Sequence, residues 1–145
     1  MKAEAYLQLK EKHEKEMNNF PIAYAFDSKQ LEEALEKLGA TKEECVTVFN
    51  MGDVMKKTDV PAFKAMLKRH KEELLEAMKD DDFAEGAFLY EMNNHEYAIN
   101  WSGDEDVLSC FNMNTAKLRE MGLTGAYRRA RIKHMRIAHE EWGII

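Results

Sequence analysis

The spacing of apolar residues predicts a series of amphipathic helices. Apolar side chains recur every three to four positions over 6–20, 28–38 and 63–78, with charged residues between them, and this spacing is typical of a helix with one buried face. Capping signals support the second and third segments, because Asp27 and Gln30 suit a helix start, Gly39 suits a helix end, and Pro61 suits a first turn. Further helices are expected over 83–94, 103–110 and 124–142.

Short runs of β-branched and aromatic residues predict strands between these helices. The runs lie at 22–26, 45–49 and 97–101, and the turn residues after 45–49 allow a hairpin into a further strand at 53–57. The first strand is expected inside the sheet. The predicted fold class is α+β, with a small, mostly antiparallel sheet packed against about six helices. A chain of 145 residues with 45% apolar residues fits a single domain over 1–145.

Charge is distributed unevenly along the chain. The formal net charge is -6, yet residues 115–145 carry seven Lys and Arg against three Asp and Glu, which leaves a net charge of -10 on residues 1–114. Helical geometry places Arg128 and Arg131 in an apolar arc with Ile132, Met135 and Trp142. These three apolar side chains are expected in the core. The two arginines then need carboxylate partners, since unpaired buried charges are costly.

The outward ridge of the same helix is the candidate nucleic-acid surface. It holds Arg129, Lys133 and Arg136, and Glu140 shares it. Dedicated nucleic-acid binders more often have a domain pI above about 9, whereas the pI here is near 5.4. Nucleic-acid binding is therefore kept as an alternative to internal ion pairing.

Composition excludes several other classes. The chain lacks a signal-peptide-like start and any apolar run long enough to span a membrane, and its two cysteines have no C-x-x-C spacing. A cytoplasmic protein with reduced thiols and no membrane contact is expected. HExxH, EF-hand, P-loop and GxGxxG motifs are all absent. No cofactor and no metal ion is predicted.

One polar junction carries candidate chemistry. Glu91, Asn94, His95 and Glu96 lie where a helix is expected to meet a strand. Glu91 and His95 are four residues apart, so the carboxylate has the spacing to orient the imidazole as a general base. The alternative is structural, because Asn93 and Asn94 suit a helix C-terminus and His95 suits its last carbonyls. We favour the structural interpretation, and no residue is assigned as catalytic.

Two segments resemble a family of small, uncharacterised proteins of bacteria and their phages. The first is a short strand ending in Ala-Phe that leads into a helix with glutamine in its first turn; the second is a Leu-Tyr-Glu helix followed by Asn-His-Glu-aromatic. The matching positions are Ala25, Phe26, Gln30, Leu89, Tyr90, Glu91, Asn94, His95, Glu96 and Tyr97. The resemblance covers about residues 19–101. It implies a phage or mobile-element gene and carries over no catalytic residue.

The leading functional hypothesis is a small, non-enzymatic protein that binds a host protein complex, for example as an inhibitor of a defence nuclease. Six carboxylates on predicted outer helix faces are the candidate interaction residues: Glu32, Glu33, Glu36, Glu72, Glu73 and Glu76. Such an array would steer the protein towards a basic partner. The alternatives are a nucleic-acid-binding accessory protein and an enzyme centred on Glu91 and His95. The oligomeric state is left open.

Overall fold

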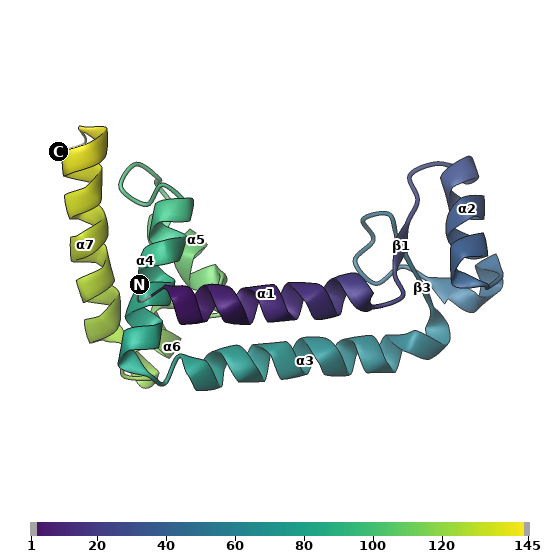
Figure 1. Cartoon of the computed structure of the whole chain (residues 1–145), viewed down its shortest axis with the longest axis horizontal. Coiled ribbons are helices and arrows are strands. Elements are labelled where there is room, and N and C mark those ends of the chain that lie inside the picture. Colours follow the sequence, from purple (N-terminus) through teal and green to yellow (C-terminus); the bar gives the residue numbers. More distant parts are fainter. Residues whose placement is uncertain (1–2, 144–145) are drawn as a thin grey trace. The chain divides into compact units, whose positions relative to one another are not determined.

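The computed structural model describes residues 3–143, and its contacts divide the chain into two compact units (Figure 1). Residues 1–12 and 70–145 form the first, which we call the helical unit; residues 13–69 form the second, the sheet unit. Seven α-helices and a three-stranded antiparallel sheet within the described residues confirm the α+β class. The single domain over 1–145 stays a prediction.

The helical unit is built around α4 and α7. Its elements are α4 (Asp81–Asn94), α5 (Gly103–Ser109), α6 (Thr115–Glu120) and α7 (Thr124–Trp142), together with the beginning of α1 (Glu4–Asn19) and the end of α3 (Val60–Ala77). Asp80 caps the start of α4, because its carboxylate accepts a hydrogen bond from the Phe83 amide at 2.9 Å.

Small residues let α4 and α7 pack closely (Figure 1). Ala84 and Ala87 of α4 and Ala126 and Ala130 of α7 are fully buried. The Phe88 ring fills the space beside them, with its centroid 5.1 Å from those of both Phe111 and Tyr127 in edge-to-face geometry. α4 is buried on several faces, which makes it the centre of this core.

The buried face of α7 differs from the one predicted. Ala126, Ala130, His134 and Ala138 face the core, whereas Ile132 and Trp142 are 54% and 43% exposed. The reason is that close packing against α4 selects the face with the smallest side chains, not the most apolar one. The arginines expected in the apolar arc, Arg128 and Arg131, are likewise exposed.

The strand predicted at 97–101 is wrong, because this segment is a turn. Glu96 takes a left-handed conformation (φ 51°), and the Tyr97 amide bonds back to the Met92 carbonyl of α4. The Ala98 amide donates to Nε2 of His134 at 3.0 Å. The amides of Tyr97 and Ala98 are thus used by a nearby backbone carbonyl and by a histidine side chain, and are not available to pair with a strand.

The sheet unit holds three short antiparallel strands in the order β1-β3-β2, namely β1 (Ala23–Tyr24), β2 (Cys45–Val46) and β3 (Asp53–Lys56). Ala23 pairs with Val54, and Cys45 pairs with Lys56. The hairpin from the second predicted strand into 53–57 is therefore confirmed. The first strand, expected inside the sheet, lies at its edge.

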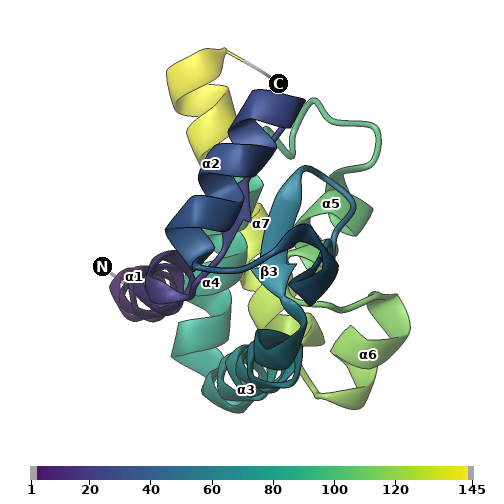
Figure 2. The same cartoon turned by 90° about the vertical axis from the view of Figure 1, so that its right-hand side faces the viewer.

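Helix α2 (Ser28–Leu38) packs beside this sheet (Figure 2), and two single-turn helices, η1 (Lys42–Glu44) and η2 (Lys57–Asp59), flank β2 and β3. The predicted caps of α2 are confirmed. Asp27 accepts from the Gln30 amide at 2.7 Å, the Gln30 side chain accepts from the Phe26 amide at 2.8 Å, and Gly39 ends the helix at φ 64°. The core of this unit contains a cluster of Ala23, Ala34, Leu38 and Val54, and Met55 and Phe63 are fully buried as well.

A buried aspartate orders the turn between β2 and β3. The Asp53 carboxylate accepts hydrogen bonds from the Thr47 hydroxyl at 2.8 Å and from the amides of Val48, Phe49 and Met51. Burial raises the pKa of Asp53, but these hydrogen bonds outweigh it and lower the pKa to about 2. The turn is thus held by a carboxylate that stays ionised.

None of the helices within residues 3–143 is both long enough and apolar enough to cross a membrane.

Candidate functional site

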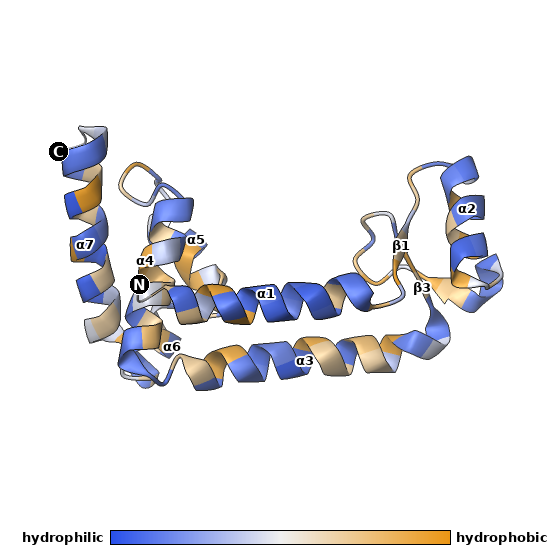
Figure 3. Cartoon of the chain, in the orientation of Figure 1, coloured by the Kyte–Doolittle hydropathy of each residue, from blue (hydrophilic) through white to orange (hydrophobic). Residues whose placement is uncertain are grey.

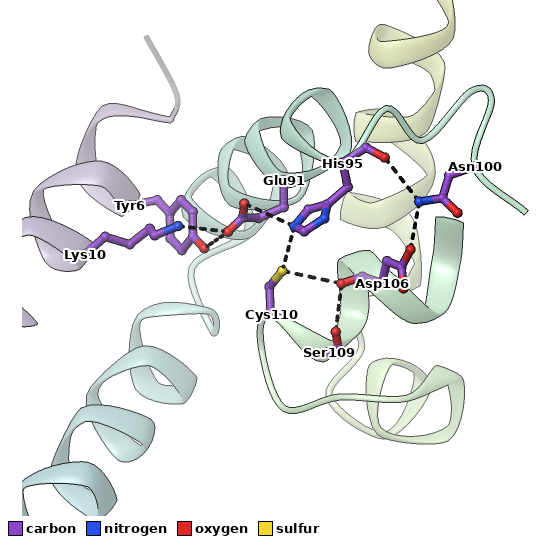
Figure 4. A network of polar contacts seen from close by, with 8 residues as sticks. All are labelled: Tyr6, Lys10, Glu91, His95, Asn100, Asp106, Ser109 and Cys110. Atoms are coloured by element: carbon purple, nitrogen blue, oxygen red, sulfur yellow. Dashed lines mark hydrogen bonds and ion pairs between the residues drawn. The ribbon is translucent and has the colours of Figure 1, made fainter. Parts of the chain in front are cut away.

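The last turn of α4 brings Glu91 and His95 together (Figure 4). They are four residues apart on one helix face, and His95 Nε2 lies 3.9 Å from Oε1 of Glu91. His95 occupies the C-cap position, and its amide donates to the Glu91 carbonyl. His95 thus lies where α4 ends, and its neighbours Asn93 and Asn94 are still helical while Glu96 supplies the left-handed residue. A purely structural role of His95 stays a prediction.

Glu91 is a buried carboxylate whose two oxygens differ in surroundings. Its side chain is 3% exposed, and Oε2 accepts hydrogen bonds from the Tyr6 hydroxyl and from Lys10 Nζ, the latter at 3.1 Å. Within residues 3–143, Oε1 has no hydrogen-bond partner. Burial, followed by the hydrogen bond to Glu91, raises the pKa of Tyr6. Tyr6 therefore stays a neutral donor that fixes the carboxylate.

Cys110 is the third member of this site, and sequence reasoning missed it. It is the C-cap residue of α5, and its Sγ lies 3.3 Å from Nε2 of His95. No motif joins Cys110 to His95 across fifteen residues; only the turn at 95–102 brings α5 back to the end of α4. Asn100 holds that turn by donating to the His95 carbonyl at 3.3 Å and to Asp106 at 2.7 Å (Figure 4).

The other two members of the predicted polar junction, Asn94 and Glu96, are exposed and lie outside this cluster. Asn93 serves a different contact, since its Oδ1 lies 2.7 Å from Nδ1 of His134. Burial lowers the pKa of His134, which keeps the ring neutral between Asn93 and the Ala98 amide. This second histidine is a structural tie between α4, the 95–102 turn and α7.

The surroundings of Cys110 do not suit a nucleophile. Burial, and then the Glu91 charge, raise the pKa of the thiol. Catalytic thiolates are stabilised by helix N-termini and adjacent cations, whereas Cys110 lies at the C-terminal end of α5 and faces a carboxylate. An enzyme that attacks substrate through this sulfur is therefore disfavoured.

The predicted basic ridge is largely paired with α4. Arg129 Nε contacts Oε1 of the buried Glu85 at 2.6 Å and also pairs with Asp81, while Lys133 pairs with the other oxygen of Glu85. Ion pairing of the basic helix with acidic residues is thus confirmed, but through Arg129 and Lys133 and not through Arg128 and Arg131. Arg136 is exposed. This pairing leaves less positive charge for phosphates, and nucleic-acid binding stays a prediction.

The two predicted acidic clusters have different environments. Glu32, Glu33 and Glu36 are exposed on α2, whose ribbon is mostly hydrophilic in Figure 3. On α3 and just beyond it, Glu72 is exposed, Glu76 pairs with Lys79 at 2.7 Å, and Glu73 is half-buried, 3.5 Å from Lys12. Of these two clusters, only the one on α2 has all three of its carboxylates exposed.

The sheet unit also exposes four large apolar side chains, which the sequence pattern does not predict to be exposed. They are Tyr24 (59% exposed), Phe26 (77%), Phe49 (46%) and Met51 (73%), which we call the apolar surface. The Phe26 ring packs directly against the backbone of Gly52, because a Cβ built at Gly52 would lie 2.5 Å from this ring. The Gly52 carbonyl also accepts a hydrogen bond from the Ala25 amide, so β1 and the turn before β3 are in contact here. Tyr24 and Phe26 belong to the apolar run at 22–26 that predicts the first strand. This strand lies at the edge of the sheet, and both side chains are exposed.

Comparison with curated proteins and with solved structures gives no match. A family match, by contrast, extends over residues 5–130, most of the chain and both units. It includes Glu91, His95 and Cys110 as well as the apolar surface. The chain therefore belongs to the family described as "Family of unknown function (DUF7659)".

Proposed function

We propose that the protein acts by binding another protein, through the apolar surface of the sheet unit. The observation that carries this is the exposure of Tyr24, Phe26, Phe49 and Met51 in a unit of only 57 residues, 13–69. Large exposed apolar patches are uncommon on proteins that work alone, and they typically mark interaction sites. Aromatic residues and methionine are also the side chains enriched in such interfaces.

The neighbouring charges indicate the chemistry of the partner. Between residues 24 and 37 the chain carries four carboxylates against two lysines, a net charge of -2. Tyr24 and Phe26 line one depression of about 410 Å³ between β1 and α2 together with Glu33 and Lys37, so apolar and charged groups share a single surface. Its complement is an apolar patch bordered by Lys and Arg, as on a protein that itself binds nucleic acid. A host nuclease complex is one such partner, and the phage context implied by the resemblance stays a prediction.

The turn that carries Met51 and Phe49 is ordered before any partner arrives. Asp53 holds it through three backbone amides and the Thr47 hydroxyl. The edge-to-face contact of Phe49 with Phe63 fixes one more ring. A preordered surface loses less conformational entropy on binding, which favours affinity.

The test is affinity capture from host lysate with the full chain, with and without nuclease treatment. Two variants address the surface: Phe26→Ser with Met51→Ser, and Glu32, Glu33 and Glu36 reversed to lysine. The matched control is Trp101→Ser, which removes a fully exposed apolar side chain of the helical unit. We expect to capture a basic partner with and without nuclease treatment. The variant with Phe26→Ser and Met51→Ser should lose this partner, the charge-reversed variant should associate with it more slowly, and the Trp101→Ser control should retain it.

Two results would overturn this proposal. One is a captured partner that binds both surface variants and the control equally well. The other is concentration-dependent self-association in sedimentation experiments that the Ser variant abolishes, because a second copy of the chain would then be what covers the surface.

A further inference from the structure

Three side chains with metal-ligating atoms meet in the helical unit. One oxygen of Glu91, one ring nitrogen of His95 and the sulfur of Cys110 all lie within 4.8 Å of one another. We infer that Glu91, His95 and Cys110 form a binding site for one divalent cation of the zinc type. Figure 4 shows them converging from the end of α4 and the end of α5.

The distances between the donors suit tetrahedral coordination. Zinc bonds of about 2.3 Å to sulfur and 2.0–2.2 Å to nitrogen and oxygen place neighbouring donors about 3.3–3.6 Å apart. His95 Nε2 lies 3.3 Å from the sulfur and 3.9 Å from Oε1 of Glu91. The Cys110 sulfur and the Glu91 oxygen lie within 4.8 Å of each other, so side-chain adjustments of about 1 Å bring all three donors onto one ion.

The carboxylate supplies an independent indication of a ligand. Among the described residues, Oε1 of Glu91 is buried without a hydrogen-bond partner, and it faces His95. Leaving such an oxygen unsatisfied is costly. The other oxygen is held by Tyr6 and Lys10, in the way that protein groups commonly orient a ligating carboxylate. A cation at the centre of the three donors satisfies the remaining oxygen.

The donor set selects the class of metal. Magnesium and calcium prefer oxygen ligands, whereas a thiolate, an imidazole and a carboxylate together suit zinc. On binding, the S–H bond of Cys110 breaks, a sulfur–metal bond forms, and the proton leaves to solvent. Three protein ligands leave the fourth position to a water molecule or a donor atom of a bound ligand. His95 is 36% exposed on its side chain, so this position is reachable from solvent.

The electrostatic surroundings favour a cation. Both ligand-bearing helices present their C-terminal ends, where carbonyl groups carry partial negative charge. The positive charge facing the site is Lys10, whose side chain is 46% exposed and contacts the other carboxylate oxygen. The lysine therefore neutralises part of the carboxylate without filling the position between the three donors.

The probe for this site is Co²⁺, which takes zinc positions and reports its ligands by absorption. Titration of the reduced full chain should saturate at one ion and develop the intense near-ultraviolet band of a thiolate–cobalt bond with the visible bands of tetrahedral cobalt. Cys110→Ser should abolish the thiolate band. The matched control is Cys45→Ser, which removes the other half-buried cysteine, in the sheet unit, and should leave the spectrum unchanged.

Two further measurements keep the result decisive. Zn²⁺ should raise the melting temperature of the wild-type protein and of Cys45→Ser, but not that of Cys110→Ser, whose metal-free melt checks its folding. Tyr6→Phe, which frees the ligating carboxylate, should weaken Co²⁺ binding by about 10–100-fold. Should Cys110→Ser fail to fold, His95→Gln takes its place, with loss of binding as the expected result. Cobalt binding without a thiolate band, a band lost instead with Cys45→Ser, or no saturable binding would overturn the inference.

Discussion

The two units differ in how far they bury their large apolar side chains. In the helical unit, large rings such as Phe88 and Phe111 are fully buried, and so are the carboxylates Glu85 and Glu91. In the sheet unit, Met55 and Phe63 are also fully buried, but Tyr24, Phe26 and Met51 are mostly exposed. The comparison teaches that the two units bury their large apolar side chains to different extents. The helical unit has the larger core, whereas the sheet unit leaves several of its large apolar side chains exposed.

The strongest test of this comparison removes one phenylalanine from each unit. Phe88→Ala should destabilise the helical unit by about 3–5 kcal/mol, because it leaves a large cavity beside Phe111 and Tyr127. Phe26→Ala should change stability by less than about 0.5 kcal/mol, since its ring is 77% exposed. Thermal and urea unfolding of both variants measure the difference. Equal losses would contradict this difference between the units.

A smaller effect is expected from acid in the sheet unit. The folded-state pKa of Asp53 is lowered to about 2, below the ordinary value of about 3.9. Its contribution to stability is therefore fully present above pH 4 and is lost as the pH falls towards 2. Asp53→Asn should lower stability by about 1–3 kcal/mol at neutral pH, since the turn amides lose an ionised acceptor. It should also flatten the pH dependence of amide exchange in residues 47–52; an unchanged profile would show that Asp53 does not control the turn.

The smallest effect concerns the face of α7. Ile132 is 54% exposed, so Ile132→Ser should alter stability by less than about 0.5 kcal/mol. Ala130→Leu, two positions away but fully buried against α4, should cost about 1–3 kcal/mol through overpacking. The pair is compared by the same unfolding curves. A large loss at Ile132 with tolerance at Ala130 would restore the buried face that helical periodicity predicts.

Local signals predicted most of the elements because their causes lie within a few residues. Asp27, Gln30 and Gly39 delimit α2 through bonds made inside the segment, and Asp80 begins α4 in the same way. The prediction of a strand at 97–101 fails for a reason that is only partly local. The Tyr97 amide donates a hydrogen bond to the Met92 carbonyl, and the Ala98 amide donates to Nε2 of His134, 36 residues further along the chain. The strand preferences of residues 97–101 contain no information about a hydrogen bond to a residue so far along the chain.

The sequence by itself determined the α+β class, the helix boundaries set by caps, the hairpin into β3, and the pairing of a basic C-terminal helix with acidic residues. It also placed Glu91 and His95 on one helix face, because a spacing of four is a property of the helix alone. The tertiary structure decided that α7 is buried by its alanines, that β1 is an edge strand, and that Cys110 joins His95. These outcomes depend on which surfaces fit closely together. Close packing and chain reversal are set by residues far apart in the sequence, so no local pattern contains them.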